Sequence, residues 1–480
     1  MRYIKRFFIE VTSLVIILSF GEVFSQDDPK ILPTDPNSLA IKYSVDFTEK
    51  TGEIRPINGV NLWANYSCQT IEDRRPDAEA CHFSTVRLHD VPWDNNGLRL
   101  VDVHQIFGNL DADPKDPANY FFAATDDYIS NIIKGGSVPI YRLGTSIEHS
   151  PNHYFTIEPK DPEHYAEICA GIVRHYNAKW ANGYEWNIPY WEIWNEPDVT
   201  NNMWTGDYAS YCRFYVIIAK RLRAEFPNIK IGGPALTHAG YEQIASLAKL
   251  CKSEGAPLDF VSWHCYARTP SELLEPPFKM RKILDEAGFP NAELHINEWH
   301  YFPTEWSIVH GTAGSYQDRV DAYTSPTGIN GAESAAFIAL TLTRWLDTPL
   351  SMSNYYAYGL ERWGVNDVYG KLRPTYYALR FFGEQRNEAP NRVKTQDPGQ
   401  YVSLLGSVDD SGAVKRLLVS VYKQDASQTL VIALKGVPSD GEVQVDYVDY
   451  DHDFKSEKVQ YHDNKLRLNA QKSSIFLVRF

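Results

Sequence analysis

The sequence predicts an α/β barrel of eight parallel strands, the (β/α)8 TIM-barrel fold class, with an accessory all-β sandwich after it. Short apolar runs alternate with helical patterns from about residue 55 to 377, eight such runs are present, and only strand-like runs follow residue 382. A chain of 480 residues, 43% of them hydrophobic, can bury cores of this size. We expect a signal peptide at 1–25, an N-terminal segment at 26–54, the barrel at 55–382 and the sandwich at 383–480.

Each predicted barrel strand is a short apolar run bounded by polar or turn residues. The helices between the strands have recognisable ends, because Asp161-Pro162 begins one helix and Gly135-Gly136 ends another. Residues 334–345 are predicted as the helix before the last strand. The eight predicted strands are 57–63, 84–89, 137–143, 190–194, 229–233, 260–266, 293–299 and 350–356.

The predicted sandwich rests on alternation and turn composition. Val443, Val445 and Tyr447 alternate with Gln444 and Asp446, as in a half-buried strand. The turns between the runs are rich in Asp, Ser and Gly. The expected strands are 401–408, 415–422, 428–434, 442–449 and 474–480, and residues 40–47 alternate in a way that could add one more.

The first 25 residues have the layout of a secretory signal peptide. Basic residues precede an apolar stretch at 11–20, and Val23 and Ser25 stand at the usual positions before a cleavage site at Gln26. The stretch is too short to span a bilayer stably, although Glu10 at its start leaves an uncleaved anchor as the alternative. We expect a secreted or periplasmic protein, with no membrane insertion after cleavage.

The cysteines do not indicate a metal or redox motif. There are six, none in C-x-x-C spacing, and this density is far below that of a disulfide scaffold. Cys169 falls on an apolar helical stripe and is predicted to lie in the core. Cys68 and Cys81 flank a polar loop, and the sequence leaves open whether a disulfide joins them.

Charge and aromatic content narrow the class of ligand. The 47 Lys and Arg residues against 61 Asp and Glu residues give a net charge of −14, which excludes a phosphate backbone as the expected partner, so no nucleic acid is predicted to bind. Aromatic residues make up 13% of the chain. Aromatic faces suit stacking on sugar rings, and a large core with ordinary surface tyrosines is the alternative. The oligomeric state does not follow from the sequence.

Two acids follow apolar strands at positions where an α/β barrel collects its reactive residues. Glu196 ends the fourth predicted strand and Glu298 the seventh, and each is preceded by Asn. The carboxyl ends of barrel strands meet on one face. Two carboxyl groups on that face suit glycosidic cleavage, in which one protonates the departing oxygen and the other attacks the sugar. The alternative is that each is a surface carboxylate at a strand end.

The surroundings of the two acids predict different roles. Trp194, Pro197 and a negatively charged partner would disfavour ionisation of Glu196, as a general acid requires. Glu298 must stay ionised as a nucleophile, and Arg87 at the end of the second strand could lower its pKa.

The motifs Trp-Asn-Glu-Pro-Asp at 194–198 and Asn-Glu-Trp at 297–299 resemble those of clan A retaining glycosidases, and the surrounding sequence resembles glycoside hydrolase family 39, which includes β-xylosidases and α-L-iduronidase. The resemblance covers most of the chain and implies the same barrel with a β-sandwich. It implies that Glu196 is the acid/base and Glu298 the nucleophile, and that Asn195 holds the sugar 2-hydroxyl. Arg87 and His89 resemble the family's strand-two Arg and sugar-binding His, and His264 and Tyr266 its His-x-Tyr pair.

Further residues are expected to bind substrate or support the site. Tyr266 can donate its hydroxyl hydrogen to Glu298, and His89 and His264 could read ring hydroxyls or, alternatively, be core histidines. Trp299 is expected to contact the sugar. After the last strand the family places an aromatic and then acidic residues, and Glu361 is the candidate counterpart here.

Other aromatics near strand ends are assigned to the face where a sugar would bind, whereas Tyr128, Tyr165 and Tyr176 are assigned to the core. The aromatics assigned to the sugar-binding face are Trp194, Tyr266, Trp299, Tyr301, Tyr355 and Tyr356.

No metal or cofactor is implied. A metal site built from His264, His295 and His300 is not predicted, because strict alternation puts His295 on the strand face opposite His300 and Glu298.

The sequence therefore predicts a retaining glycosidase, most simply a β-xylosidase-like exo-enzyme on plant-type glycans. The alternatives are another exo- or endo-glycosidase acting on galactose-, arabinose- or uronate-containing chains, or a non-catalytic glycan-binding protein on the same fold.

Overall fold

The computed structural model describes residues 42–64, 73–93, 98–200, 202–359, 362–367, 369–397 and 399–480. The predicted signal peptide, Cys68 and Glu361 lie outside these ranges, so the role of Glu361 stays a prediction. Cys81, for which the sequence left a disulfide with Cys68 open, is a free, buried cysteine. No helix in the described ranges is long and apolar enough to cross a bilayer.

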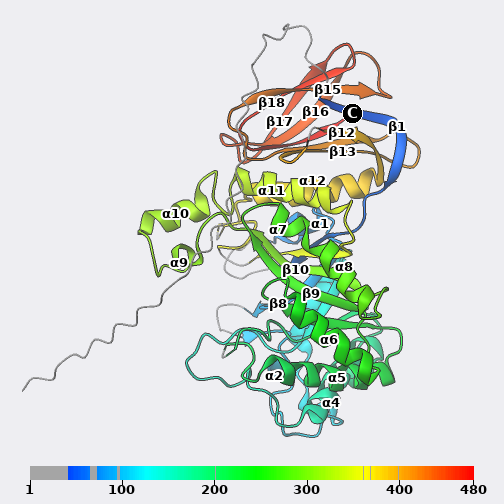
Figure 1. Ribbon diagram of the computed structural model, residues 1–480, viewed down its shortest axis with the longest axis vertical. Coiled ribbons are helices and arrows are strands. Elements are labelled where there is room, and N and C mark those ends of the chain that lie inside the picture. Colours follow the sequence, from blue (N-terminus) through cyan, green and yellow to red (C-terminus); the bar gives the residue numbers. More distant parts are fainter. Residues whose placement is uncertain are drawn as a thin grey trace, which may run out of the picture. The chain divides into compact units, whose positions relative to one another are not determined.

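Eight parallel strands close into a barrel, which confirms the predicted fold class (Figure 1). Each predicted strand contains one observed strand, or overlaps it with an end shifted by a few residues. Neighbours around the barrel follow chain order, and the last strand pairs with the first. The barrel strands are β2 (Asn58–Asn61), β3 (Thr85–Leu88), β6 (Val138–Leu143), β7 (Tyr190–Ile193), β8 (Lys230–Leu236), β9 (Phe260–Ala267), β10 (Glu293–Tyr301) and β11 (Met352–Tyr355).

Helices and short segments connect the barrel strands, and their ends have the expected chemistry. The side chain of Asp161 accepts a hydrogen bond from the backbone N–H of His164 at the start of α4, and Gly135 follows the last residue of α3. The helices are α1 (Arg75–Glu79), α2 (Val103–Ile106), α3 (Ala123–Lys134), α4 (Pro162–Asn177), α5 (Tyr208–Glu225), α6 (Tyr241–Glu254), α7 (Ser271–Leu274), α8 (Pro276–Glu286), α9 (Trp306–Val309), α10 (Tyr316–Thr324), α11 (Ala332–Trp345) and α12 (Pro374–Glu388), with 3-10 turns at Pro117–Asn119 and Trp180–Asn182 and a two-strand ribbon of β4 (Pro92–Trp93) and β5 (Leu98–Arg99).

The C-terminal region forms a second, mostly antiparallel sheet of nine strands. The strand from the N-terminal segment, β1, joins this sheet, antiparallel to β12 and parallel to β15. Sequence patterns missed β12, β17 and β18. Strand β17 was missed because it is exposed along most of its length and lacks an apolar alternation. The strands are β1 (Tyr43–Glu53), β12 (Asn391–Gln396), β13 (Val402–Val408), β14 (Lys415–Val421), β15 (Gln428–Lys435), β16 (Gly441–Val448), β17 (Lys455–Tyr461), β18 (Lys465–Ala470) and β19 (Ser474–Arg479).

Two hydrophobic clusters account for most of the core. One lies within the nine-stranded sheet and includes Leu430 and Val445. The other fills the barrel and its helical layer and extends to Leu418 and Leu477 of the sheet. Helix α11 contacts both β10 of the barrel and β14 and β19 of the sheet, and almost all of its residues are buried. A helix that is apolar around its whole circumference is stable only when it is covered on all sides, and the sheet supplies that cover.

Candidate active site

Glu196 and Glu298 stand at the carboxyl ends of β7 and β10, on the face where barrel strands present reactive groups. Glu196 has a left-handed backbone, with φ of 45°, and its N–H donates to Ala235 O at 2.9 Å. Left-handed backbone in a residue other than glycine costs free energy and is concentrated at functional sites. The hydrogen bond to the β8 end holds the loop after β7 in place, so the carboxyl group is positioned by two strands.

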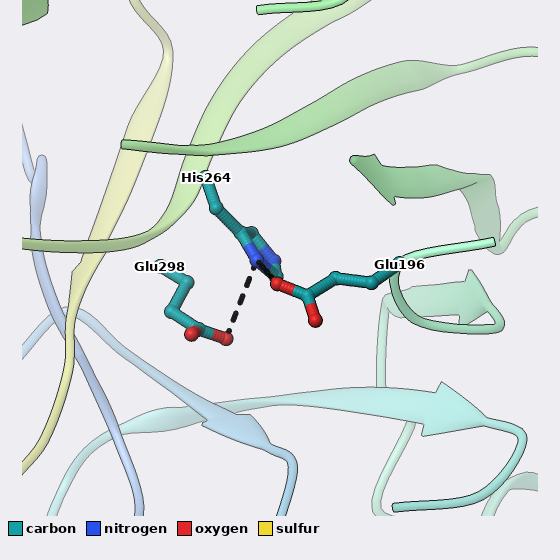
Figure 2. A group of neighbouring side chains, drawn as sticks. All are labelled: Glu196, His264 and Glu298. Atoms are coloured by element: carbon teal, nitrogen blue, oxygen red, sulfur yellow. Dashed lines mark hydrogen bonds and ion pairs between the residues drawn. The ribbon is translucent and has the colours of Figure 1, made fainter. Parts of the chain in front are cut away.

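His264, on β9, lies between the two acids, as Figure 2 shows. Its Nδ1 is 2.7 Å from Glu196 Oε1 and 3.5 Å from Glu298 Oε2. One carboxylate oxygen of each glutamate and this nitrogen all lie within 4.8 Å of one another. The fold therefore brings together two acids that are separated by about a hundred residues of sequence.

Arg87 links the residues around the nucleophile candidate. Its Nη1 lies 3.3 Å from Glu298 Oε2, its Nη2 donates to Asn195 Oδ1 at 2.6 Å, and its Nε donates to Glu192 Oε2 at 2.7 Å. The guanidinium is fully buried. Because Asn195 accepts from Arg87 with its oxygen, its amide N–H groups are left to donate to a ligand.

Glu192 is a buried acid that the sequence analysis did not single out. It accepts hydrogen bonds from Ser262 at 2.7 Å and from Asn297, in addition to the ion pair with Arg87. A buried guanidinium needs a compensating negative charge, and Glu192 supplies that charge to Arg87 from a position that is itself fully buried. In the sequence, Glu192 could have been recognised as an acidic residue in the middle of an otherwise apolar strand.

The environment of Glu196 favours its protonated form. Burial raises its pKa to about 8, and the negative charges of Asp198 and Asp90 act in the same direction, whereas Arg87 opposes them. Burial also lowers the pKa of His264, so this imidazole is neutral near neutral pH. The protonated carboxyl of Glu196 can then donate to an unprotonated Nδ1 of His264. This is the state that a general acid needs before the reaction.

Glu298 receives the hydrogen bonds that stabilise a carboxylate. Tyr266 donates to Oε1, and Arg87 contacts Oε2. Arg87 acts in the predicted direction, but burial outweighs it and raises the pKa of Glu298 above the usual value. The expected effect of Arg87 is therefore present, but the net pKa is raised, because the desolvation of a fully buried carboxyl is larger than the effect of one cation. Of the two acids, Glu298 has the donors that favour ionisation.

His89 and Asp90 follow β3 and have polar atoms without partners among the described residues. His89 is 3% exposed, and its Nε2 lies 3.4 Å from Asp90 Oδ2, which also accepts from the hydroxyl of Tyr356 at 3.2 Å. His89 Nδ1 and Asp90 Oδ1 are buried and have no hydrogen-bond partner in the described part of the chain. Burial and the nearby Arg87 lower the pKa of His89. Such unpaired atoms beside the acids can bind ligand hydroxyls.

Trp299 does not face the site, and its assignment as a substrate-binding residue is wrong. It is fully buried, and its ring packs against Trp345 of α11 and Tyr355. Adjacent strand residues point to opposite faces, so the residue after Glu298 turns toward the helical layer. Trp194, Tyr301 and Tyr355 are also buried, in contact with Trp204, Phe337 and His300 respectively, so these assignments fail for the same reason.

Strict alternation along β10 does not hold at the site. The pairing with β9 shifts between Ile296 and Glu298, and both Asn297 and Glu298 contact the network of Arg87 and Glu192. The prediction that strict alternation places His295 on the strand face opposite His300 and Glu298 is therefore wrong. His295 stacks on Phe260 and bonds to Glu293, while His300 bonds to the hydroxyl of Tyr355 at 2.6 Å, so each has other partners than His264.

Glu196, His264 and Glu298 are of the residue types that bind metal ions and are close enough to do so. Both oxygens of Glu298 are, however, already engaged by Tyr266 and Arg87. A guanidinium 3.3 Å from the carboxylate repels a second cation at the same place. The chemistry of this set fits proton transfer between acids better than cation binding.

An aromatic cluster that the sequence analysis did not identify surrounds Tyr266. The ring of Trp306, at the start of α9, lies 5.0 Å from that of Tyr266 and is stacked on Phe302 at 4.3 Å. Trp363 also contacts Tyr266, at 5.6 Å. The ring of Trp306 also stacks with His310 at 5.3 Å, and because Trp306 is 44% exposed, part of it is accessible to a ligand next to the site.

Comparison with known proteins gives consistent matches. A family model described as glycosyl hydrolases family 39 matches residues 53–453. A β-xylosidase of Caldicellulosiruptor saccharolyticus is 22% identical over 460 residues, covering 85% of each chain. A β-xylosidase of Geobacillus stearothermophilus is 26% identical over 270 residues, and that alignment spans 48% of each chain.

Solved structures share the fold at low sequence identity. A glucosidase from Croceicoccus marinus superposes with a TM-score of 0.72 at 19% identity, covering 92% of this chain and 99% of that one. A monomeric β-xylosidase from Caulobacter crescentus gives a TM-score of 0.67 at 16% identity, covering 91% and 98%.

Proposed function

The chain belongs to glycosyl hydrolase family 39 and is a glycoside hydrolase, and we propose that it retains the anomeric configuration through a covalent glycosyl ester on Glu298. The observation that carries the proposal is the spacing of the acids. A carboxylate oxygen of Glu196 lies within 4.8 Å of one of Glu298. Carboxyl groups about 5–5.5 Å apart fit direct attack, whereas inversion needs about 6.5–9.5 Å to admit a water.

In the first step the Glu298 carboxylate attacks the anomeric carbon, and the bond from that carbon to the leaving oxygen breaks. Glu196 gives its proton to the leaving oxygen, so the alcohol departs neutral. In the second step the Glu196 carboxylate takes a proton from water, and the water oxygen attacks the same carbon. The ester bond to Glu298 breaks, and Glu196 is again protonated.

Positioning residues support both steps in this proposal. Arg87 and Tyr266 keep Glu298 in line and ionised, and Asn195 donates to the sugar 2-hydroxyl, an interaction that strengthens in the transition state.

We propose a β-xylosidase-like exo-enzyme that acts on plant-type oligosaccharides or polysaccharides. The two β-xylosidase relatives support this substrate. The signal-peptide pattern supports a secreted or periplasmic location.

The test of the mechanism uses aryl glycosides that differ only in the sugar, with NMR detection of the first anomer released. We expect the fastest hydrolysis with the β-xyloside and a β-anomer as first product. Glu298→Ala should lower kcat by roughly four orders of magnitude or more, and added azide should restore turnover with an α-glycosyl azide as product.

Glu298→Ala that keeps full activity would refute the nucleophile, and an α-anomer as first product would refute retention. Faster hydrolysis of a galactoside, arabinoside or uronide than of the xyloside would refute the sugar assignment while leaving the mechanism intact. Glu293→Ala is the matched control, because Glu293 lies on the same strand but pairs with Lys230 and His295.

A further inference from the structure

The nine-stranded sheet contains a pocket of about 630 Å³, formed by residues of the sheet and its connections. We propose that this pocket is a second carbohydrate-binding site, which holds a neutral oligosaccharide segment without cleaving it. The lining residues used below come from β16 to β19 and from the connection after β16, and none of them belongs to the candidate active site.

The pocket opens between the two edges of the sheet. Strands β17 and β18 are the edge strands, and the described residues form no ladder between them. Lining residues come from both edges, Glu457 and Val459 from β17 and Arg467 and Asn469 from β18. The pocket therefore opens at the gap between these two edge strands, above buried residues of the sheet core.

The floor of the pocket is apolar and partly aromatic. Val445, Tyr447, Leu468 and Phe476 line it, and the rings of Tyr447 and Phe476 are 5.8 Å apart. A sugar ring has one face of C–H groups and an edge of hydroxyl groups. The floor residues are 1–8% exposed and close the bottom of the pocket, and an apolar floor beneath a polar rim matches both parts of such a ring.

The rim carries balanced charge and unused hydrogen-bonding groups. Lys455 lies 3.4 Å from Glu457, and the lining carries two acidic residues, Asp449 and Glu457, against two basic ones, Lys455 and Arg467. The guanidinium of Arg467 has no hydrogen bond or ion pair in the described part of the chain, and it offers five donors. A balanced rim with free donors favours a neutral polyhydroxyl ligand over an anion or a cation.

The identity of the ligand rests on the proposed function, because a glycosidase meets neutral glycan chains as substrates. A second site on the same chain would raise the local concentration of substrate at the active site. The pocket volume falls within the roughly 300–1,000 Å³ typical of ligand sites.

Affinity electrophoresis of the full chain in gels containing neutral xylan, mannan or β-glucan tests this proposal. We expect retardation by at least one of them, and about tenfold weaker binding for Arg467→Ala combined with Asn469→Ala. The activity of this variant on an aryl glycoside should stay unchanged, because the small substrate needs only the active site. Lys458→Ala is the matched control, since Lys458 lies on β17 but pairs with Glu442 outside the pocket.

Equal retardation of the double variant and the control would overturn the proposal, and so would the absence of retardation in every gel. Retardation only by a uronate-bearing polysaccharide, lost in high salt, would overturn the neutral class of ligand. The outcome is independent of catalysis, because Glu298→Ala should be retarded like the parent chain whether or not aryl glycosides are hydrolysed. Thermal unfolding of each variant verifies that the sheet is folded.

Discussion

At the scale of single residues, the donors around each acid divide the two catalytic tasks. The side chain of Glu298 is 8% exposed and has contacts from Tyr266 and Arg87, whereas the side chain of Glu196 is 18% exposed and contacts neutral His264. In the proposed mechanism the more accessible acid exchanges protons with water in each cycle. The more enclosed acid, which is held by two donors, is the one proposed to stay ionised and attack the sugar.

The pH dependence of kcat/KM should report the protonation of Glu196. Its pKa is raised to about 8, so the acid is protonated below that pH and loses its proton as the pH rises through it. Activity should therefore fall on the alkaline side with an apparent pKa of about 8. In Glu196→Ala, measured with a dinitrophenyl glycoside that needs no acid, this alkaline limb should disappear. An unchanged limb in that variant would show that another group sets it.

Removing the hydroxyl of Tyr266 should instead change the acidic limb of the pH profile, the range in which activity rises as Glu298 loses its proton. Tyr266→Phe deletes a donor to Glu298, which stabilises the carboxylate, so the pKa of Glu298 should rise and the acidic limb should move to higher pH. We expect kcat to fall by roughly tenfold to a hundredfold. Tyr355→Phe is the control, because that hydroxyl bonds to His300 and neither glutamate. A drop in kcat without a shift of the limb would limit Tyr266 to a packing role.

At the scale of secondary-structure elements, the irregularity in β10 and the short helix α9 shape the site. The shift in pairing before Glu298 allows Asn297 and Glu298 to contact one polar network, which a regular strand would not permit. Helix α9 brings Trp306 against Tyr266, and Tyr266 contacts the nucleophile. An exposed ring at this position suits the sugar or aryl group that leaves in the first step.

Substitution of Trp306 should affect the first chemical step only. Trp306→Ala should lower kcat/KM for xylo-oligosaccharides by roughly tenfold to a hundredfold, by analogy with base stacking on aromatic side chains. The kcat for a dinitrophenyl glycoside should stay constant when hydrolysis of the glycosyl ester is rate-limiting, because the leaving group has gone. Tyr316→Ala, at a 74% exposed aromatic of the neighbouring α10, is the control. Equal losses in kcat/KM for xylo-oligosaccharides and in kcat for the dinitrophenyl glycoside would contradict a contact between Trp306 and the leaving group.

At the scale of the whole molecule, the core cluster of the barrel extends into the sheet. Helix α11 is buried between β10 and the strands β14 and β19, and Ser420 of the sheet donates to Ala336 O of that helix at 2.7 Å. Separation of the two would expose an apolar helix face to water. The barrel therefore depends on the sheet for its stability.

Unfolding in urea should consequently show a single transition, with loss of fluorescence and loss of activity at the same concentration. Leu418→Ala, at the contact between sheet and barrel, should lower the free energy of unfolding by about 2–5 kcal/mol. Leu430→Ala, inside the sheet core, should lower the urea concentration at the midpoint of the same single transition. Two transitions, with activity surviving the first, would contradict this dependence.

Much of the fold was predictable because it depends on local patterns. The eight apolar runs locate the barrel strands, and Asp161-Pro162 locates the start of α4, since both signals act over a few residues. Strand β17 was not predictable, because an exposed edge strand carries charged residues on most positions. Trp299 was misassigned because nearness to Glu298 in sequence was read as nearness to the site, whereas consecutive residues of a strand point to opposite faces and Trp299 is buried.

By itself the sequence determined the barrel class, the two acids and the expected family, because apolar runs and Asn-Glu motifs are local and can be read without coordinates. Only the tertiary structure decided the distance between the acids, the buried ion pair of Arg87 with Glu192, and which aromatics are exposed beside the site. It also decided how strongly each acid is buried and which donors contact it, and burial raises the pKa of Glu196 to about 8. These properties depend on burial and on contacts between strands that are far apart in the chain, and no local pattern encodes them.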